Sequence, residues 1–210
     1  MVETIAIERI TLYDLERRFN LQLVEDPTFF WEWQSDLPVL TIAEQQRLER
    51  VQAAYANLER RSLLENTVKL AVLAPLLDLA GFFLPPFCVD TEKAVEIVTE
   101  ENGIELRGRM DVLVLIEQIW LLVIESKRAE FSLKVGIPQV LGYMLSSPHP
   151  YQPLFGLVTN GNSFVFVKLI HQDVPRYAKS KEFILDQDNG LALTLQILKK
   201  IGQKTAHNRN

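Results

Sequence analysis

Two carboxylates and one ammonium group lie on two neighbouring apolar stretches of this chain. Asp111 interrupts the run over residues 110–116, and Glu125 and Lys127 follow the run over residues 119–124. Carboxylate oxygens are ligands that Mg²⁺ prefers, and an ammonium group can neutralise the negative charge that develops on a phosphate under attack. If the two runs are adjacent strands, these side chains form a minimal divalent-metal site for phosphodiester hydrolysis.

The triplet Glu125-Ser126-Lys127 is the only acid-x-lysine triplet in the sequence. Alternate side chains of a strand share a face, so Glu125 and Lys127 point to one side and Ser126 points to the other. The alternative interpretation is a strand that leaves the core, where a Glu/Lys pair on one face is a weak ion pair in solvent.

Asp111 favours the metal-site interpretation because it is an acid inside an apolar strand. Burying an unpaired carboxylate costs several kcal/mol, so Asp111 needs a partner or a metal ion. Arg109, two residues away on the same face, is the competing partner.

The register of the two strands decides between these interpretations. A two-residue loop at Glu117 and Gln118 would set Asp111 opposite Ile124, with the two carboxylates on opposite faces. A three-residue loop, or an equivalent β-bulge, would set Asp111 opposite Glu125. The metal site requires the second arrangement, and we predict it.

Runs rich in Val, Ile and Leu predict five strands and the helices between them. The strands are expected over residues 94–99, 104–116, 119–127, 154–159 and 164–170, with turns at residues 101–103 and 160–162. Helices are predicted over residues 137–145, where Pro138 fits the first turn, and over residues 191–201, ahead of a frayed polar tail.

The first 61 residues are predicted to form an appended helical extension. Thr41 and Glu44 have the spacing of a capping box, and apolar residues then recur at helical spacing, at Leu48, Val51, Tyr55 and Leu58. Upstream, the aromatic segment over residues 29–33 is either a base-stacking surface or a hydrophobic plug between helices, and the plug is favoured.

A second helix is predicted from Ser62 towards Pro75, kinked at the proline and continuing to Leu79, with Gly81 as its stop.

Composition limits the class of protein. A chain of 210 residues that is 48% hydrophobic and 23% charged suits one α/β domain with an added helical segment. Its net charge of -5 argues against a general nucleic-acid coat but leaves room for a local basic surface.

Cys88 is the single cysteine, no signal segment opens the sequence, and charges and prolines interrupt the apolar stretch over residues 68–87. We therefore expect a cytoplasmic protein with no membrane span. The histidines are scattered, which does not indicate zinc.

The arrangement of Asp111, Glu125 and Lys127 resembles the PD-(D/E)XK nuclease superfamily. Members with a glutamine-x-x-x-tyrosine helix after the third core strand are matched by Gln139 and Tyr143, whose spacing places both on one helix face. Helix packing is the alternative role for this pair. Many members also carry a glutamate on the preceding helix.

In this sequence that glutamate would be Glu65. Ser62-x-x-Glu65 is itself a capping-box pattern, so the roles of metal ligand and helix cap both stay open for Glu65.

The longer run from Glu65 through residues 75–82 and 107–111 to Tyr143 is most similar to the N-terminal nuclease domain of type I restriction enzyme R subunits and to stand-alone cyanobacterial restriction endonuclease-like proteins. The resemblance covers residues 62–170. Met110 stands where the family name has proline, and no ATP-dependent translocase follows, so we expect a translocating restriction enzyme to need more than this chain.

The resemblance implies a restriction-endonuclease-like α/β core, with a central mixed β-sheet flanked by helices, over residues 62–203. The N-terminal extension would then span residues 1–61 and the polar tail residues 204–210. It further implies a Mg²⁺-dependent DNA endonuclease.

The implied roles fall on named residues. Asp111, Glu125 and Glu65 would bind Mg²⁺, with Mn²⁺ as a substitute, and Lys127 would position water or stabilise the transition state. Gln139 and Tyr143 would contact substrate or support Lys127, and Arg109 is a candidate phosphate contact. The expected partners are DNA, a second copy of the chain, and a separately encoded helicase or methyltransferase. The alternative function is a non-catalytic nucleic-acid-binding or assembly module that serves such a partner.

Overall fold

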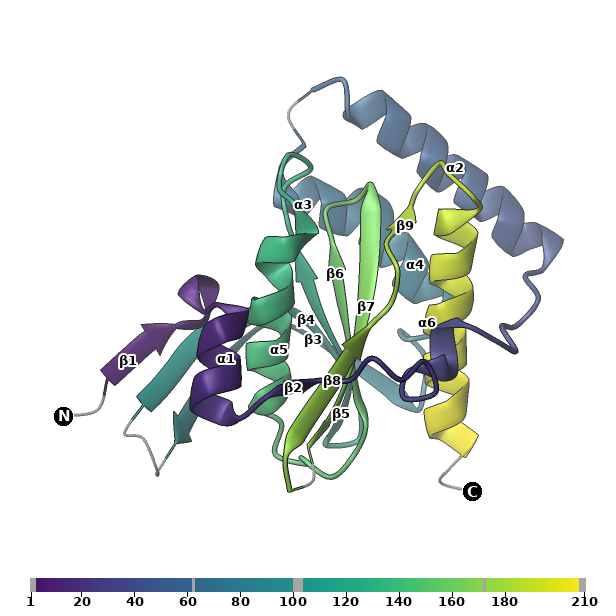
Figure 1. Ribbon diagram of the computed structural model, residues 1–210. Helices are drawn as coiled ribbons and strands as arrows, with labels where there is room; N and C mark the ends of the chain where they lie inside the picture. Colours follow the sequence, from purple (N-terminus) through teal and green to yellow (C-terminus); the bar gives the residue numbers. More distant parts are fainter. Residues whose placement is uncertain (1–2, 62, 100–103, 172, 208–210) are drawn as a thin grey trace.

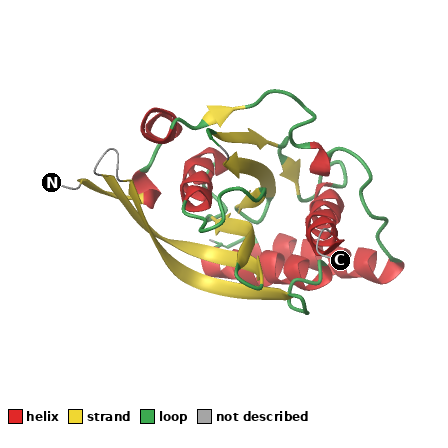
Figure 2. Ribbon diagram, turned by 90° about the horizontal axis from the view of Figure 1, so that it is seen from below, coloured by secondary structure: helices red, strands yellow, loops and turns green. Residues whose placement is uncertain are grey.

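The structure is organised around one mixed β-sheet with helices on both faces (Figures 1 and 2). It is a computed structural model that describes residues 3–61, 63–99, 104–171 and 173–207. Strand order in the nine-stranded sheet is β1-β4-β5-β6-β7-β8-β2, with β3 paired to β4 and β9 paired to β7. The pairs β1–β4, β5–β6 and β2–β8 are parallel and the others are antiparallel. The predicted fold class, an α/β protein with a central mixed sheet flanked by helices, is confirmed.

The strands are β1 (Glu3–Ala6), β2 (Gln22–Leu23), β3 (Phe87–Thr99), β4 (Ile104–Ile116), β5 (Ile119–Ser126), β6 (Leu154–Thr159), β7 (Ser163–His171), β8 (Pro175–Lys179) and β9 (Phe183–Ile184). The helices are α1 (Leu12–Phe19), α2 (Ile42–Leu58), α3 (Glu65–Val68), α4 (Ala74–Leu79), α5 (Gly136–Leu145) and α6 (Gly190–His207). The 3-10 turns are η1 (Ile7–Arg9), η2 (Trp31–Trp33) and η4 (Leu133–Val135), and η3 (Lys69–Leu73) is a π-helical turn between α3 and α4.

The five predicted strands are present. Four further strands, β1, β2, β8 and β9, were not predicted. β4 and β6 have the predicted bounds, whereas β3 begins at Phe87 rather than at residue 94. The predicted turn over residues 101–103 lies outside the described residues. Gly161, in the predicted turn between β6 and β7, has a φ of +88°, a conformation that glycine adopts without strain.

The prediction of an appended helical extension over residues 1–61 is wrong. β1 pairs with β4 and β2 pairs with β8, so this region supplies two strands to the same sheet. Its helices also pack into the cores through Leu15 of α1 and Leu48 of α2. Strands of two to four residues are too short to show a period in sequence, which is why they were missed.

Two helix ends also differ from prediction. α6 continues to His207, so residues 204–207 of the predicted tail are helical. At the other helix, Leu64 is the N-cap of α3 and Glu65 is its first residue, which is not the third position that a capping box requires. Ser62 lies outside the described residues. By contrast, the capping box of α2 is present, with Glu44 and Thr41 bonded reciprocally at 3.2 and 2.7 Å.

Each face of the sheet carries its own hydrophobic core. On one face, α2, the α3–η3–α4 segment and α6 pack through residues such as Val51, Val72 and Leu195. On the other face, α1 and α5 pack through residues such as Leu15 and Leu141. None of the described helices combines the length and the apolar character that crossing a membrane requires.

Strand β4 has a gap along one edge. β3 pairs with β4 over its whole length, so β1 and β5 must share the opposite edge. β1 covers residues 104–107 of β4 and β5 covers residues 112–116. The intervening residues 108–111, which include Asp111, therefore lie between the ends of two strands. Backbone groups in such a gap need other partners, and side chains can reach them there.

The aromatic segment around η2 is a buried plug, as the sequence favoured. Phe30 is buried against Phe155, and the Trp33 ring meets Phe183 edge to face. Within this plug Glu32 is fully buried and accepts hydrogen bonds from Lys168 of β7, at 2.8 and 3.0 Å, and from Lys204 of α6, at 2.6 Å. Glu32 thus ties the N-terminal region to the sheet and to the last helix.

Replacing Glu32 with glutamine is expected to lower the free energy of unfolding by about 3–5 kcal/mol, because the buried Lys168 ammonium loses its counterion. Urea denaturation would measure the change. Glu49→Gln on the exposed face of α2 is the control and should change stability by less than about 0.5 kcal/mol. Equal stability of both variants would contradict a structural role for the Glu32 network.

Candidate active site

A β-bulge in the β4–β5 hairpin sets the register between the strands that carry the two predicted carboxylates. The β4–β5 hairpin turns through Glu117 and Gln118, and its first pairs are Ile116 with Ile119 and Leu115 with Trp120. The register then shifts by one residue, so that Val114 pairs with Leu122 and Val112 with Ile124. Continued by one more residue, this register places Asp111 opposite Glu125. The β-bulge that the prediction required is present. That Asp111 and Glu125 share a face stays a prediction.

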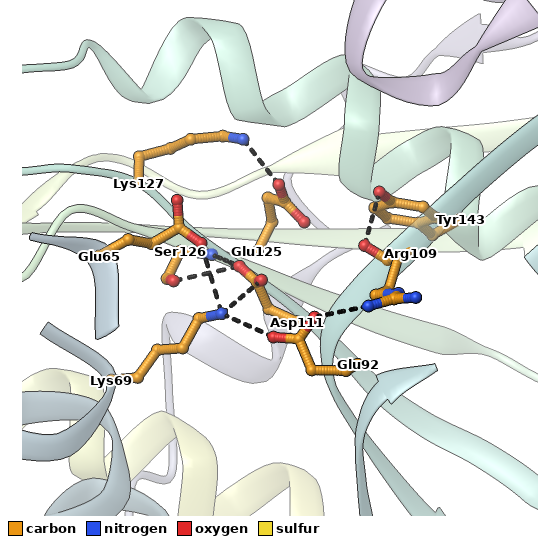
Figure 3. Close-up of polar contacts among 9 residues, drawn as sticks. All are labelled: Glu65, Lys69, Glu92, Arg109, Asp111, Glu125, Ser126, Lys127 and Tyr143. Carbon is orange, nitrogen blue, oxygen red and sulfur yellow. Dashed lines mark hydrogen bonds and ion pairs between the residues drawn. The ribbon is translucent and has the colours of Figure 1, made fainter. Parts of the chain in front are cut away.

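The Asp111 carboxylate accepts hydrogen bonds at the point where the backbone pairing of β4 with β5 ends. Its Oδ2 accepts the backbone N–H of Ser126 at 2.6 Å and the Ser126 hydroxyl at 3.1 Å. Its Oδ1 accepts the Lys69 ammonium at 2.6 Å (Figure 3). The competing sequence interpretation, in which Arg109 pairs with Asp111, is wrong. The Arg109 side chain is 65% exposed and lies 3.9 Å from Glu92 instead.

Glu125 and Lys127 form a partly enclosed pair rather than the solvent-exposed pair of the alternative interpretation. Lys127 Nζ donates to Glu125 Oε1 at 2.6 Å, and Glu125 is only 5% exposed. The second carboxylate oxygen, Oε2, is buried without a hydrogen-bond partner. Burial, and next the negative charge of Asp111, raise the pKa of Glu125 to about 7, although Lys127 opposes the shift. This oxygen is available to a further donor or cation.

Lys69 is a central member of the site that sequence reasoning missed. Its Nζ lies 2.6 Å from Asp111, 3.2 Å from Glu92 and 3.3 Å from Glu65 (Figure 3). Burial opposes its charge, but the hydrogen bond to Asp111 and the nearby carboxylates raise its pKa above the ordinary value. The i, i+4 spacing of Glu65 and Lys69 on a predicted helix was the only available sign.

Glu92 was also missed, and nothing in the sequence indicates its role. It lies between the pairs Thr91–Val112 and Lys93–Met110, which places it across from Asp111 on β3. Its φ of 54° is left-handed, a conformation that costs a non-glycine residue about 1–2 kcal/mol. Such strained positions are frequent at functional sites. The conformation allows the Glu92 side chain to reach both Lys69 and Arg109.

Gln139 and Tyr143 hold the backbone around the gap in β4. The Tyr143 hydroxyl donates to the carbonyl of Arg109 at 2.9 Å, and Gln139 donates to the carbonyl of Glu8, just after β1, at 3.0 Å. Both side chains are buried. A Cβ on Gly108 would come within 2.9 Å of the Tyr143 ring, so glycine is needed there for this contact. The geometry matches the packing alternative for these two residues, and substrate contact stays a prediction.

The cluster as a whole has an excess of negative charge. Its four carboxylates, those of Glu65, Glu92, Asp111 and Glu125, outnumber the three cationic groups paired with them, those of Lys69, Lys127 and Arg109. Within the described residues, no three acidic, histidine or cysteine side chains are arranged to hold a metal ion as they stand. The ammonium of Lys69 lies among three of these carboxylates. The donor set is nevertheless all oxygen, and Glu125 Oε2 has no partner, which fits a hard cation.

Comparisons with known proteins find only structural likeness. No family model and no curated protein matches the sequence. A fragment described as the HsdR subunit of a type I restriction enzyme from Vibrio vulnificus YJ016 is 19% identical over 50% of this chain, with a TM-score of 0.38. A cryo-electron microscopy structure of a DrdV–DNA complex is 16% identical over 74% of this chain, with a TM-score of 0.46. The chain spans 21% and 13% of the lengths of these two proteins. An assignment of function therefore depends on this chain's own side chains.

In metal-free protein, Glu125 is expected to make stability fall as pH rises. Its folded-state pKa of about 7 lies above the ordinary 4.5, so its contribution is fully present below pH 4.5 and is lost as pH rises through about 7. The difference in unfolding free energy between wild type and Glu125→Gln should change by roughly 3 kcal/mol over this range. Urea denaturation in a chelating buffer would measure it. A difference that stays constant with pH would show that Glu125 ionises normally.

Proposed function

We propose that this protein is a Mg²⁺-dependent DNA endonuclease of the PD-(D/E)XK, restriction-endonuclease-like type. The observation that carries the proposal is the bulged register that sets Asp111 level with Glu125, two residues before Lys127. A regular hairpin would separate the two acids onto opposite faces. Bulges next to active sites commonly aim a side chain.

Asp111, Glu125 and Glu65 are the residues that would hold Mg²⁺, or Mn²⁺ as a substitute. All three present carboxylate oxygens from different elements to one cluster. When bound, the metal ion supplies a water of lowered pKa and positive charge next to the scissile phosphate. Glu125 must be ionised to bind it, so binding would be favoured above the Glu125 pKa of about 7 and would itself promote loss of the proton.

Lys127 would provide the positive charge for the transition state. Its ammonium is held by Glu125 at 2.6 Å and therefore has a fixed position next to the cluster. A fixed cation at the point where charge develops stabilises the transition state without reorganisation. Arg109 is largely exposed at the same site and is a candidate contact for a neighbouring phosphate. Gln139 and Tyr143 act as positioning residues, because they fix the backbone on both sides of the gap.

DNA as the substrate follows from the resemblance of the motif. One site of this kind cuts one strand, so a second copy of the chain would be needed to cut a duplex through. A separately encoded helicase or methyltransferase would be a compatible partner for a nuclease of this type.

The isosteric variants Asp111→Asn and Lys127→Met are each expected to lower cleavage of plasmid and single-stranded DNA at least about 100-fold, because each removes a charge that the reaction uses. Assays with Mg²⁺, Mn²⁺ and a chelator would measure the effect, with circular dichroism to verify folding. Lys181→Met, on the exposed segment between β8 and β9, is the control and should retain activity.

Two other results are informative. Equal cleavage by wild type and both variants would remove these residues from the mechanism. Metal and DNA binding without cleavage by wild type would favour the alternative function, a non-catalytic nucleic-acid-binding or assembly module.

A further inference from the structure

Lys69 lies where a metal ion bound to the acidic cluster would place its positive charge. Its ammonium contacts Asp111, Glu92 and Glu65 within 3.3 Å, from η3 on one side of the sheet (Figure 3). Removing Lys69 would leave Asp111, which is 8% exposed, with no cationic partner among the described contacts. The ammonium therefore neutralises a charge that a metal would otherwise neutralise.

The backbone of the helix is adapted to place Lys69 there. The segment over residues 65–79 is helical, but its middle turn is a π turn in which the N–H of Ala74 donates to the carbonyl of Lys69. Pro75 follows and has no N–H to donate, so a regular α-helical ladder is interrupted at this point. π turns inside α-helices occur mostly at functional sites. Here the turn begins at the residue that contacts the acidic cluster.

We propose that Lys69 is an internal counterion that occupies the acidic cluster in the metal-free protein and is displaced from Asp111 when a divalent cation binds. This inference rests on the proposed metal-dependent function. Two cations in contact with Asp111 would repel each other, so binding of the metal requires the ammonium to move. Metal binding is then a competition, and the affinity measured for the metal is lower than the carboxylates alone would give.

Glu92 provides a place for the displaced ammonium. It already lies 3.2 Å from Lys69 Nζ, and its side chain is 54% exposed, so the pair can reform at the edge of the cluster. A lysine side chain has four rotatable bonds and can make this movement without a change in the helix. The strained backbone at Glu92 thus has a function in this scheme, because it holds the second acceptor within reach.

The test is Mn²⁺ binding by Lys69→Met, measured by isothermal titration calorimetry and by electron paramagnetic resonance on chelator-treated protein. The variant should bind Mn²⁺ about tenfold or more tightly than wild type, and it should unfold at a lower temperature without metal. Lys93→Met is the matched control. It also removes one lysine charge, but Lys93 lies on β3 and pairs with Asp90, outside the acidic cluster. Its Mn²⁺ affinity should equal that of wild type within about twofold.

Lys69→Gln, which keeps a hydrogen-bond donor, guards against loss of folding in the methionine variant. If either variant unfolds without metal, recovery of the wild-type circular dichroism spectrum on addition of Mn²⁺ supports the exchange, and failure to recover in both counts against it.

The outcomes separate this inference from the proposed function. Mn²⁺ binding that Asp111→Asn abolishes, but that is unchanged or weaker in Lys69→Met, would overturn the exchange and keep the metal site. Binding by none of the proteins, Lys69→Met included, would overturn both.

Discussion

The Asp111 carboxylate joins three parts of the molecule that are distant in sequence. It belongs to β4, accepts the backbone N–H at the end of β5, and binds the ammonium of Lys69 on the helical segment across the sheet. A buried carboxylate is tolerated only when hydrogen bonds and a counterion replace the water it has lost. The bulge in the β4–β5 hairpin, the π turn and the left-handed Glu92 each bring one of these groups, or a neighbour of one, into place.

The gap in β4 explains why the site forms at this position in the sheet. A continuous strand alongside residues 108–111 would bond their backbone groups and leave no opening. Because β1 ends at Ala6 and β5 ends at Ser126, the carbonyl of Arg109 is bonded by Tyr143 instead. The first residues of the chain therefore define the site, although they contribute no charged group to it. This is a physical reason for treating the N-terminal region as part of the domain.

The sequence predicted the elements whose pattern extends over several residues. β4, β6 and α5 were found almost at their bounds, since long apolar runs and a proline in the first helical turn are local properties. The bulge was predicted as a requirement, because two acids in one site must share a face.

Other features depend on pairing that no local pattern encodes. β2 and β9 have two residues each, and they exist only because β8 and β7 offer free edges. The φ of Glu92 and the choice of Lys69 rather than Arg109 as the partner of Asp111 arise in the same way, from tertiary contacts. Three acids of the cluster, Asp111, Glu125 and Glu65, could thus be named from sequence, but Glu92 and the Lys69 counterion could not.

Two buried ionic clusters in this protein differ in a way that bears on function. Around Glu32, one carboxylate is matched by two lysines, and both of its oxygens are bonded inside the plug. Around Asp111, four carboxylates exceed three cationic groups, one oxygen of Glu125 has no hydrogen-bond partner, and Glu65 and Glu92 are partly open to solvent. Buried ion pairs seldom add stability beyond what apolar residues would give, so stability alone is a weak reason for a buried cluster with unbalanced charge. Excess negative charge, a free oxygen and access from solvent are the properties that support the proposed metal site.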